Sequence, residues 1–207
     1  MGNIIDDIRA NEDTFADRPF NEVDSLALAQ LSYARMPVNV PRLDAEATDV
    51  DLAMVGVRDL LRAECYDDMF GKVWSPSMNV DLLRAMCESP RWRDLRVGGY
   101  VDEFDPETTK QFSACVFDVG DGSSYVAFRG TDSTIVGWKE DFAMAFRRPV
   151  AAQESAARYL ADIAGLRDGP LMVGGHSKGG NLAVYAAANA PAAVQERLIA
   201  VFCHDGP

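Results

Sequence analysis

The chain has 207 residues, of which 48% are hydrophobic and 25% are charged, and its formal net charge is −12. This composition indicates one soluble globular domain with a sizeable core. The acidic surface would repel nucleic acid and anionic membranes, so we expect neither as a partner. No apolar run is long enough to span a membrane, and the first residues lack the basic and apolar regions of a signal peptide.

The cysteines and histidines give no sign of a metal site. The four cysteines are scattered without C-x-x-C spacing, and the chain holds two histidines. The Asp-rich stretch 118–122 lacks the glutamate that closes an EF-hand calcium loop, so a hairpin turn is the better interpretation. We therefore expect reduced thiols, a cytoplasmic location, and no metal or organic cofactor. The residues predict no particular oligomeric state.

The N-terminal half is predicted to be mainly helical. Residues 1–19 are acidic, and we expect them to be loosely ordered. Asn21 and Asp24 have the spacing of a capping box, so a helix is expected to begin there. The apolar stripes of 45–69 and 80–87 predict further helices, whose apolar side chains we interpret as core.

From Leu95 the pattern changes to strands. β-rich runs at 97–104, 111–119 and 124–128 are separated by turn-forming residues, which favours an antiparallel arrangement. After residue 124, apolar strands alternate with helical stretches, which predicts parallel strands joined by crossover helices. The sequence therefore predicts one α/β domain over 20–207, with a mixed sheet, an antiparallel start and a helical N-terminal layer.

One turn in the second half carries a catalytic pattern. Gly175, Ser177 and Gly179 form the G-x-S-x-G motif of a nucleophile elbow, between a buried strand at 171–173 and a buried helix at 182–188. Such a serine has a strained backbone, and glycines two residues before and after it keep helix and strand from clashing. The alternative interpretation is a glycine-rich strand-to-helix turn with an incidental serine.

Five motifs together resemble those of a known family. They are Phe20-Asn21-Glu22-Val23-Asp24 with Leu31-Ser32-Tyr33, Gln111-Phe112-Ser113-Ala114, Phe128-Arg129-Gly130-Thr131-Asp132, Gly137-Trp138-Lys139-Glu140-Asp141-Phe142, and Gly175-His176-Ser177-Lys178-Gly179-Gly180-Asn181-Leu182-Ala183. This set resembles a family of uncharacterised bacterial lipase-like proteins of the α/β-hydrolase fold, distantly similar to the class 3 (fungal-type) triacylglycerol lipases. The resemblance implies an α/β-hydrolase-like domain.

The elbow and the resemblance assign a nucleophile and two oxyanion donors. Ser177 is the nucleophile by its position in the motif. The backbone N–H of Lys178 follows it at the start of a helix, where the helix dipole favours negative charge. Class 3 lipases place a Ser or Thr after an earlier strand to face the oxyanion, and the resemblance gives that role to Thr131. The alternative for Thr131 is a β-branched residue that simply ends a strand. A lysine can serve as a base in some serine hydrolases, but the Lys178 side chain is expected to project away.

The segment after Thr131 is expected to cover the site. Arg129 is predicted to pair with Asp132 or Asp141 and so to hold the loop. Trp138 and Phe142 have helical spacing and are predicted to form the apolar face of a covering helix. By analogy with lipases, 133–150 is the expected lid.

The sequence identifies the acid and the base of the catalytic triad less clearly than the nucleophile. Asp205 follows a buried strand at 198–202, at the sheet edge where ligands bind, and is the candidate acid; the alternative is a turn residue. His204 is a weak candidate base, because neighbouring side chains in an extended chain point opposite ways. His176 is expected to point under the elbow. The resembling proteins continue with further strands and a later histidine, so we expect that the part with the triad histidine is absent and that strand 198–202 is incompletely covered.

These features together predict a serine hydrolase of lipase or esterase type, with a small-molecule ester or lipid as its substrate and an acyl-enzyme on Ser177. One alternative is a non-catalytic α/β-hydrolase-like module that binds a ligand or partner in the same cleft. A peptidase or a thioesterase on the same scaffold is a further alternative.

Overall fold

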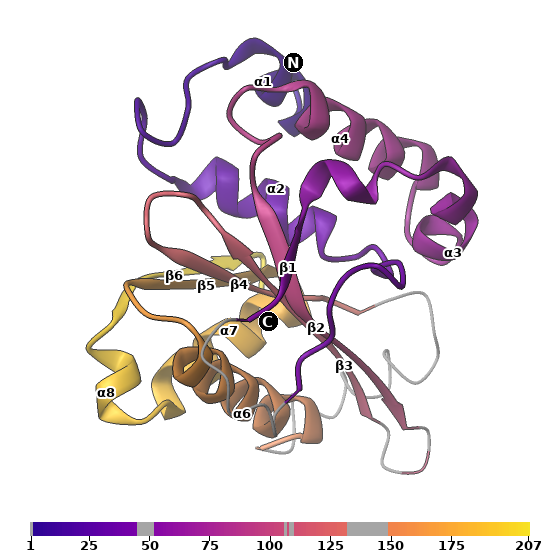
Figure 1. Cartoon of the computed structure of the whole chain (residues 1–207). Coiled ribbons are helices and arrows are strands. Elements are labelled where there is room, and N and C mark those ends of the chain that lie inside the picture. The colour runs from indigo at the N-terminus through magenta and orange to yellow at the C-terminus, as the bar shows by residue number, and fades with distance from the viewer. Residues whose placement is uncertain (1, 45–51, 106, 108–109, 132–148) are drawn as a thin grey trace.

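A six-stranded mixed sheet forms the centre of the molecule, with its strands side by side in sequence order (Figure 1). The computed structural model describes residues 2–44, 52–105, 107, 110–131 and 149–207. The first four strands pair antiparallel and the last three pair parallel. The strands are β1 (Met54–Gly56), β2 (Arg96–Asp105), β3 (Lys110–Asp118), β4 (Ser124–Phe128), β5 (Leu171–His176) and β6 (Leu198–His204). The predicted α/β class, the antiparallel start and the parallel continuation are confirmed.

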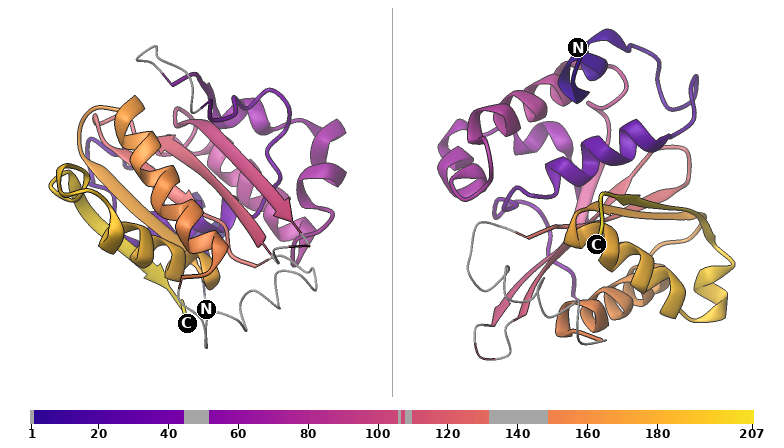
Figure 2. Two further views of the ribbon diagram at one scale, coloured as in Figure 1. Left: turned by 90° about the horizontal axis from the view of Figure 1, so that it is seen from below. Right: turned by 180° about the vertical axis from the view of Figure 1, so that it is seen from behind.

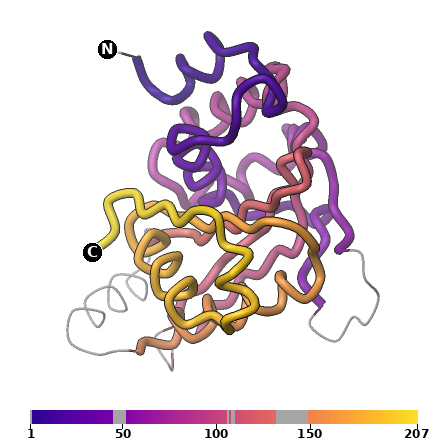
Figure 3. Tube along the Cα trace, turned by 90° about the vertical axis from the view of Figure 1, so that its left-hand side faces the viewer, coloured from indigo at the N-terminus to yellow at the C-terminus, as the bar shows by residue number. Residues whose placement is uncertain are grey.

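Helices cover both faces of this sheet (Figures 1 and 2). The parallel strands β4, β5 and β6 lie side by side in sequence order, and crossover connections between parallel strands are right-handed. The crossover helices α6 and α7 therefore lie on the same face of the sheet. Helix α2 packs on the opposite face, and α1 and α4 pack against it, which makes the predicted helical N-terminal layer (Figure 3). The helices are α1 (Ile4–Ala10), α2 (Glu22–Leu31), α3 (Tyr66–Phe70), α4 (Pro76–Glu88), α6 (Ala151–Leu166), α7 (Lys178–Asn189) and α8 (Ala192–Gln195).

Two apolar clusters fill the space between the sheet and its helical layers. Side chains alternate along β3, so Cys115 and Phe117 join the cluster under α2, whereas Phe112 and Val116 join the cluster under α6 and α7. Because helices cover both faces, a central strand such as β3 is a nearly continuous apolar run. This burial fixes the strands whose carboxyl ends carry the predicted site.

Helix α2 begins as its capping box predicts. The Asn21 side chain accepts hydrogen bonds from the backbone N–H groups of Val23 and Asp24. In return, the Asp24 carboxylate accepts a hydrogen bond from the backbone N–H of Asn21, with 2.9 Å between Oδ2 and N. These reciprocal bonds satisfy donors that the first helical turn leaves without partners. The predicted helix at 80–87 is also confirmed and lies within α4.

The N-terminal stretch is better ordered than expected. Residues 4–10 form helix α1, and Ile5 and Ile8 are 7% and 3% exposed. The expectation of a loosely ordered stretch over 1–19 was wrong for this part. Two isoleucines three residues apart give even a two-turn helix an apolar face that packs against α4.

A buried arginine fastens the rest of this stretch to α2. Arg91 pairs with Asp24 through Nε–Oδ1 and Nη2–Oδ2 contacts of 2.9 and 2.5 Å, and both residues are at most 3% exposed. Its Nη1 also donates to the carbonyl oxygens of Asp13, Thr14 and Arg18 at 2.9–3.2 Å. The guanidinium therefore ties the turn at 13–18 to the first turn of α2.

The long helix predicted over 45–69 is wrong for most of its described length, and an α-helix is present only at its end. Residues 54–56 form β1, two 3₁₀ turns follow, and α3 begins at Tyr66; residues 45–51 lie outside the described chain. Met54 pairs with Gly98 of β2, where a Cβ would overlap the carbonyl oxygen of Ala53. This distant strand pairing overrides the helical apolar spacing of the segment.

Strand β6 forms one edge of the described sheet. Ile199 and Val201 on it are 63% and 43% exposed, as expected for an incompletely covered strand. In the described part of the chain, no helix is both long enough and apolar enough to cross a membrane.

Candidate functional site

The predicted elbow has a strained backbone at Ser177. Ser177 lies between the end of β5 and the start of α7, with φ 54° and ψ −127°. Residues other than glycine rarely adopt positive φ, and such a conformation persists only where the surrounding structure enforces it. Ser177 is half-buried and donates its backbone N–H to the carbonyl oxygen of His204 at 2.8 Å. The edge strand β6 thus helps to hold the elbow.

The two motif glycines are required by close backbone approach. A Cβ on Gly175 would lie 2.5 Å from the carbonyl oxygen of Gly179 and 2.6 Å from that of Phe128. A Cβ on Gly179 would overlap the same Phe128 oxygen. Since all these neighbours are backbone atoms, no change of rotamer could make room. The predicted role of the glycines, to keep helix and strand from clashing, is confirmed, and the structure adds the close approach to Phe128 of β4.

The ends of three parallel strands bring the predicted site residues to one edge of the sheet. Phe128 of β4 is paired with Gly175 of β5, and His176 of β5 is paired with His204 of β6. Thr131, Ser177 and Asp205 follow these strand ends within three residues. This edge, at the carboxyl ends of parallel strands, is where α/β proteins bind ligands. Asp205 is exposed and has a left-handed backbone, with φ 52°.

Lys178 is the first residue of α7, where backbone N–H groups and the helix dipole favour an anion. Its side chain is 1% exposed, and Nζ donates to the carbonyl oxygen of Gln111 on β3 at 2.8 Å. This bond directs the ammonium group toward β3, as expected for a side chain that projects away from the predicted site.

The two histidines lie on the α2 face of neighbouring strands. His204 Nε2 is 2.8 Å from Ser25 Oγ, whose hydroxyl is also 2.8 Å from Tyr125 Oη. Burial, with a smaller contribution from the charge of His176, lowers the pKa of His204 below its usual 6.5. His176 Nδ1 is 3.0 Å from Tyr33 Oη. Hydroxyl groups from α2 and the turn after it therefore hold both imidazole rings.

The loop after β4 has a partner that the sequence did not reveal. Arg129 is 5% exposed, and its Nη2 bonds Asp102 Oδ1 at 2.7 Å. Asp102 Oδ2 is also 3.7 Å from Nε of Arg35. The predicted partners Asp132 and Asp141 lie outside the described residues, as do Trp138, Phe142 and the predicted lid up to residue 148.

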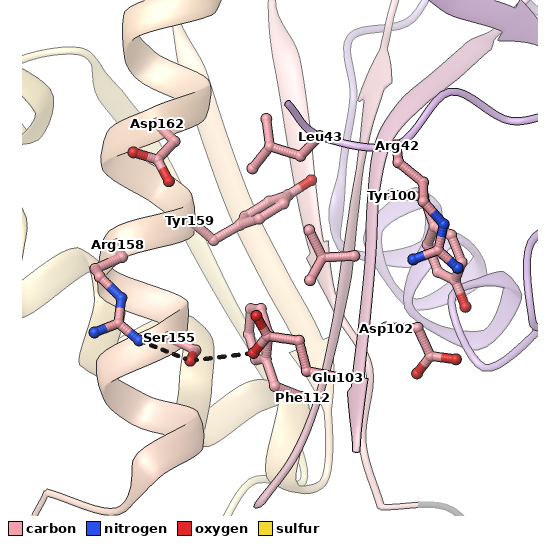
Figure 4. Close-up of a pocket in the computed structure, with 11 residues that line it drawn as sticks. Arg42, Leu43, Tyr100, Asp102, Glu103, Phe112, Ser155, Arg158, Tyr159 and Asp162 are labelled. Carbon is pink, nitrogen blue, oxygen red and sulfur yellow. Dashed lines mark hydrogen bonds between the residues drawn. The ribbon is translucent and has the colours of Figure 1, made fainter. Parts of the chain in front are cut away.

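A separate cavity of about 320 Å³ lies between α6 and the outer part of β2 (Figure 4). Ser155 and Arg158 of α6 face Glu103 of β2 across it, and Ser155 bridges the other two through hydrogen bonds. Phe112 and Tyr159 form its apolar wall. None of the predicted site residues lines this cavity.

Three residues near the elbow were missed as contributors to the site: Ser25, Tyr33 and Asp102. Tyr33 lies in the Leu31-Ser32-Tyr33 motif quoted above, and its place in that motif is the sequence feature that could have indicated a role at the site. Ser25 and Asp102 carried no comparable signal, because an isolated serine or aspartate in an element is usually a surface residue.

A mixed six-stranded sheet between two helical layers, with a strained serine at the carboxyl edge, defines an α/β protein with an elbow-type site. The Mbeg1-like family model matches residues 86–207, which is more than half of the chain and includes the elbow and strands β2–β6. The chain belongs to the Mbeg1-like family. No curated protein and no solved structure is similar enough to count as a match.

Proposed function

We propose that this protein is a lipase-like serine hydrolase of the α/β-hydrolase type, which cleaves a small-molecule ester or lipid through an acyl-enzyme on Ser177. The observation that carries the proposal is the backbone of Ser177. A strained serine between a parallel strand and the N-terminus of a helix, with glycines packed against backbone on both sides, is the arrangement of a nucleophile elbow. Membership of the Mbeg1-like family agrees with it.

The proposed reaction begins with attack of Ser177 Oγ on the ester carbonyl carbon. The serine proton passes to an imidazole base, and the negative charge that forms on the carbonyl oxygen is stabilised by the backbone N–H of Lys178 and by Thr131. The base then protonates the leaving alcohol as its C–O bond breaks. Water hydrolyses the resulting acyl-enzyme by the same steps.

His204 is the candidate base and Asp205 the candidate acid. His204 follows Ser177 in the chain, and its backbone already contacts the elbow. To accept the serine proton, His204 Nε2 would have to release Ser25 Oγ, which is 2.8 Å away. Its lowered pKa keeps the ring neutral, and so able to accept a proton, at neutral pH. Asp205 follows β6 at the same sheet edge as Ser177.

The second candidate function is a binding module that uses this fold without catalysis. It is favoured by the same Ser25 contact, which directs His204 Nε2 to α2. A non-catalytic domain would keep the elbow geometry, but its serine would not be activated.

Intact-mass measurement after treatment with a fluorophosphonate probe separates the two functions. We expect one adduct on the native chain and none on Ser177→Ala. Ser75→Ala is the matched control, because Ser75 is an exposed serine that also has positive φ, 52°, and also precedes a helix. This variant should be labelled like the native chain. An unlabelled native chain would contradict the hydrolase and favour the binding module.

A further inference from the structure

Tyr33 lies where the two halves of the proposed oxyanion site meet. It follows the end of α2 by two residues, and its ring is half-buried against the elbow. Its Oη is 3.0 Å from Nδ1 of His176, the residue before the nucleophile, and the two ring centroids are 6.1 Å apart. One side of the Tyr33 hydroxyl is therefore bound to the β5 half of the site.

The same hydroxyl also lies against the β4 half of the site. A Cβ on Gly130 would overlap Tyr33 Oη and lie 2.8 Å from Cζ of the same ring. It would also lie 2.7 Å from the carbonyl oxygen of His176. Gly130 immediately precedes Thr131, the second proposed oxyanion donor. The loop after β4, the Tyr33 hydroxyl and the backbone before Ser177 thus converge at a point where no side chain fits.

A second contact from the same turn supports the loop. Arg35, two residues after Tyr33, lies 3.7 Å from Asp102, which in turn holds Arg129 at 2.7 Å. Arg129 precedes Gly130. The turn at 33–35 therefore reaches the loop after β4 at two consecutive residues: Gly130 directly through the Tyr33 hydroxyl, and Arg129 indirectly through Asp102 of β2, which Arg35 contacts.

We propose that Tyr33 is a positioning residue that sets the spacing between Thr131 and the Lys178 N–H, and so the shape of the oxyanion site. This inference rests on the proposed hydrolase function. Oxyanion donors act only when they lie about 2.7–3.1 Å from the charged oxygen, and a misplacement of about 1 Å can cost about 100-fold in rate. The Tyr33 hydroxyl controls that spacing because it lies against Gly130, the residue before Thr131, and bonds His176, two residues before Lys178.

The test compares Tyr33→Phe with Ser32→Ala. The first removes only the hydroxyl between the two halves of the site. The second removes a buried hydroxyl from the same turn, which donates to the carbonyl oxygen of Ala29 at 2.7 Å and touches neither half. We expect Tyr33→Phe to lower the maximal rate of fluorophosphonate labelling at least about tenfold without changing the probe concentration at half-maximal rate. Ser32→Ala should label at the native rate.

Gly130→Ala completes a double-mutant cycle with Tyr33→Phe. The added methyl group competes with the Tyr33 hydroxyl for the same space. The fold-loss in labelling rate of the double variant should therefore be smaller than the product of the fold-losses of the two single variants. If the fold-loss of the double variant equals the product of the two single fold-losses, the proposal is overturned. It is also overturned if Tyr33→Phe labels at the native rate, or if Ser32→Ala loses as much labelling rate as Tyr33→Phe.

A readout independent of activity uses the two histidines of the chain. In ¹⁵N spectra of the imidazole rings, Tyr33→Phe should shift the His176 Nδ1 signal and leave that of His204 in place. An unshifted His176 signal would overturn the contact itself. If Tyr33→Phe shows this shift but the native chain shows no Ser177-dependent labelling, the contact stands while the hydrolase function fails, and the positioning role of Tyr33 fails with it.

Discussion

Gly175→Ala tests whether the elbow depends on close backbone packing. The new Cβ would lie 2.5–2.6 Å from the carbonyl oxygens of Gly179 and Phe128, where ordinary contact begins at 3.4 Å. The strand and helix would therefore have to separate by about 0.9 Å, the difference between 3.4 and 2.5 Å. Overpacking costs about 1–3 kcal/mol, and the upper end applies because backbone atoms cannot rotate away. We expect a loss of about 3 kcal/mol in the free energy of unfolding and a large loss of Ser177 labelling.

Gly165→Ala provides the matched control. Gly165 lies in α6, and a Cβ there would have nothing within 4 Å. Alanine in a helix is favoured over glycine by about 0.5–1 kcal/mol, so this variant should be more stable than the native chain and should label normally. Urea unfolding measures both changes. A Gly175→Ala variant that loses less than about 1 kcal/mol, or that labels at the native rate, would refute the packing argument.

Two further predictions concern the N-terminal layer and His204. Arg91→Ala should cost about 3–5 kcal/mol in urea unfolding, because it leaves the Asp24 carboxylate buried without its cation. The folded-state pKa of His204 lies below 6.5, so the unfolded chain binds more protons between the two values. Stability should therefore fall as pH drops below about 6.5, and NMR titration of the ring should show a midpoint below that value.

Each of these predictions has its own control. In an Asp24→Asn background the carboxylate charge is gone, so Arg91→Ala should cost clearly less; an equal cost would argue against a charge-pair origin. His204→Gln removes the titrating ring, so the fall in stability below pH 6.5 should become smaller. A His204 midpoint above 6.5 would contradict its burial against α2.

Features set by neighbouring residues could be predicted from the sequence. The capping box of α2 involves residues three apart, and the elbow involves glycines two residues on either side of Ser177. Both were predicted because their geometry is decided within a few bonds of the backbone. The alternation of strands and helices after residue 124 also predicted the parallel half of the sheet, since parallel strands require a crossover.

Contacts between distant residues could not be predicted in this way. Residues 54–56 lie in a stretch with helix-like apolar spacing but form a strand, because β2 offers an edge to pair with. Arg129 was expected to pair close by in the sequence, yet it binds Asp102, 27 residues away. Periodicity reports which side chains are buried, but it does not report which buried groups meet.

The sequence by itself therefore determined the α/β class, the position of the elbow and the identity of Ser177 as the candidate nucleophile. Only the tertiary structure decided what surrounds that serine: Tyr33 against Gly130 and His176, and Ser25 against His204. The physical reason is the range of the interactions. A turn is fixed by local backbone sterics, whereas these hydroxyl contacts join residues 97–179 positions apart and exist only after α2 has packed onto the sheet.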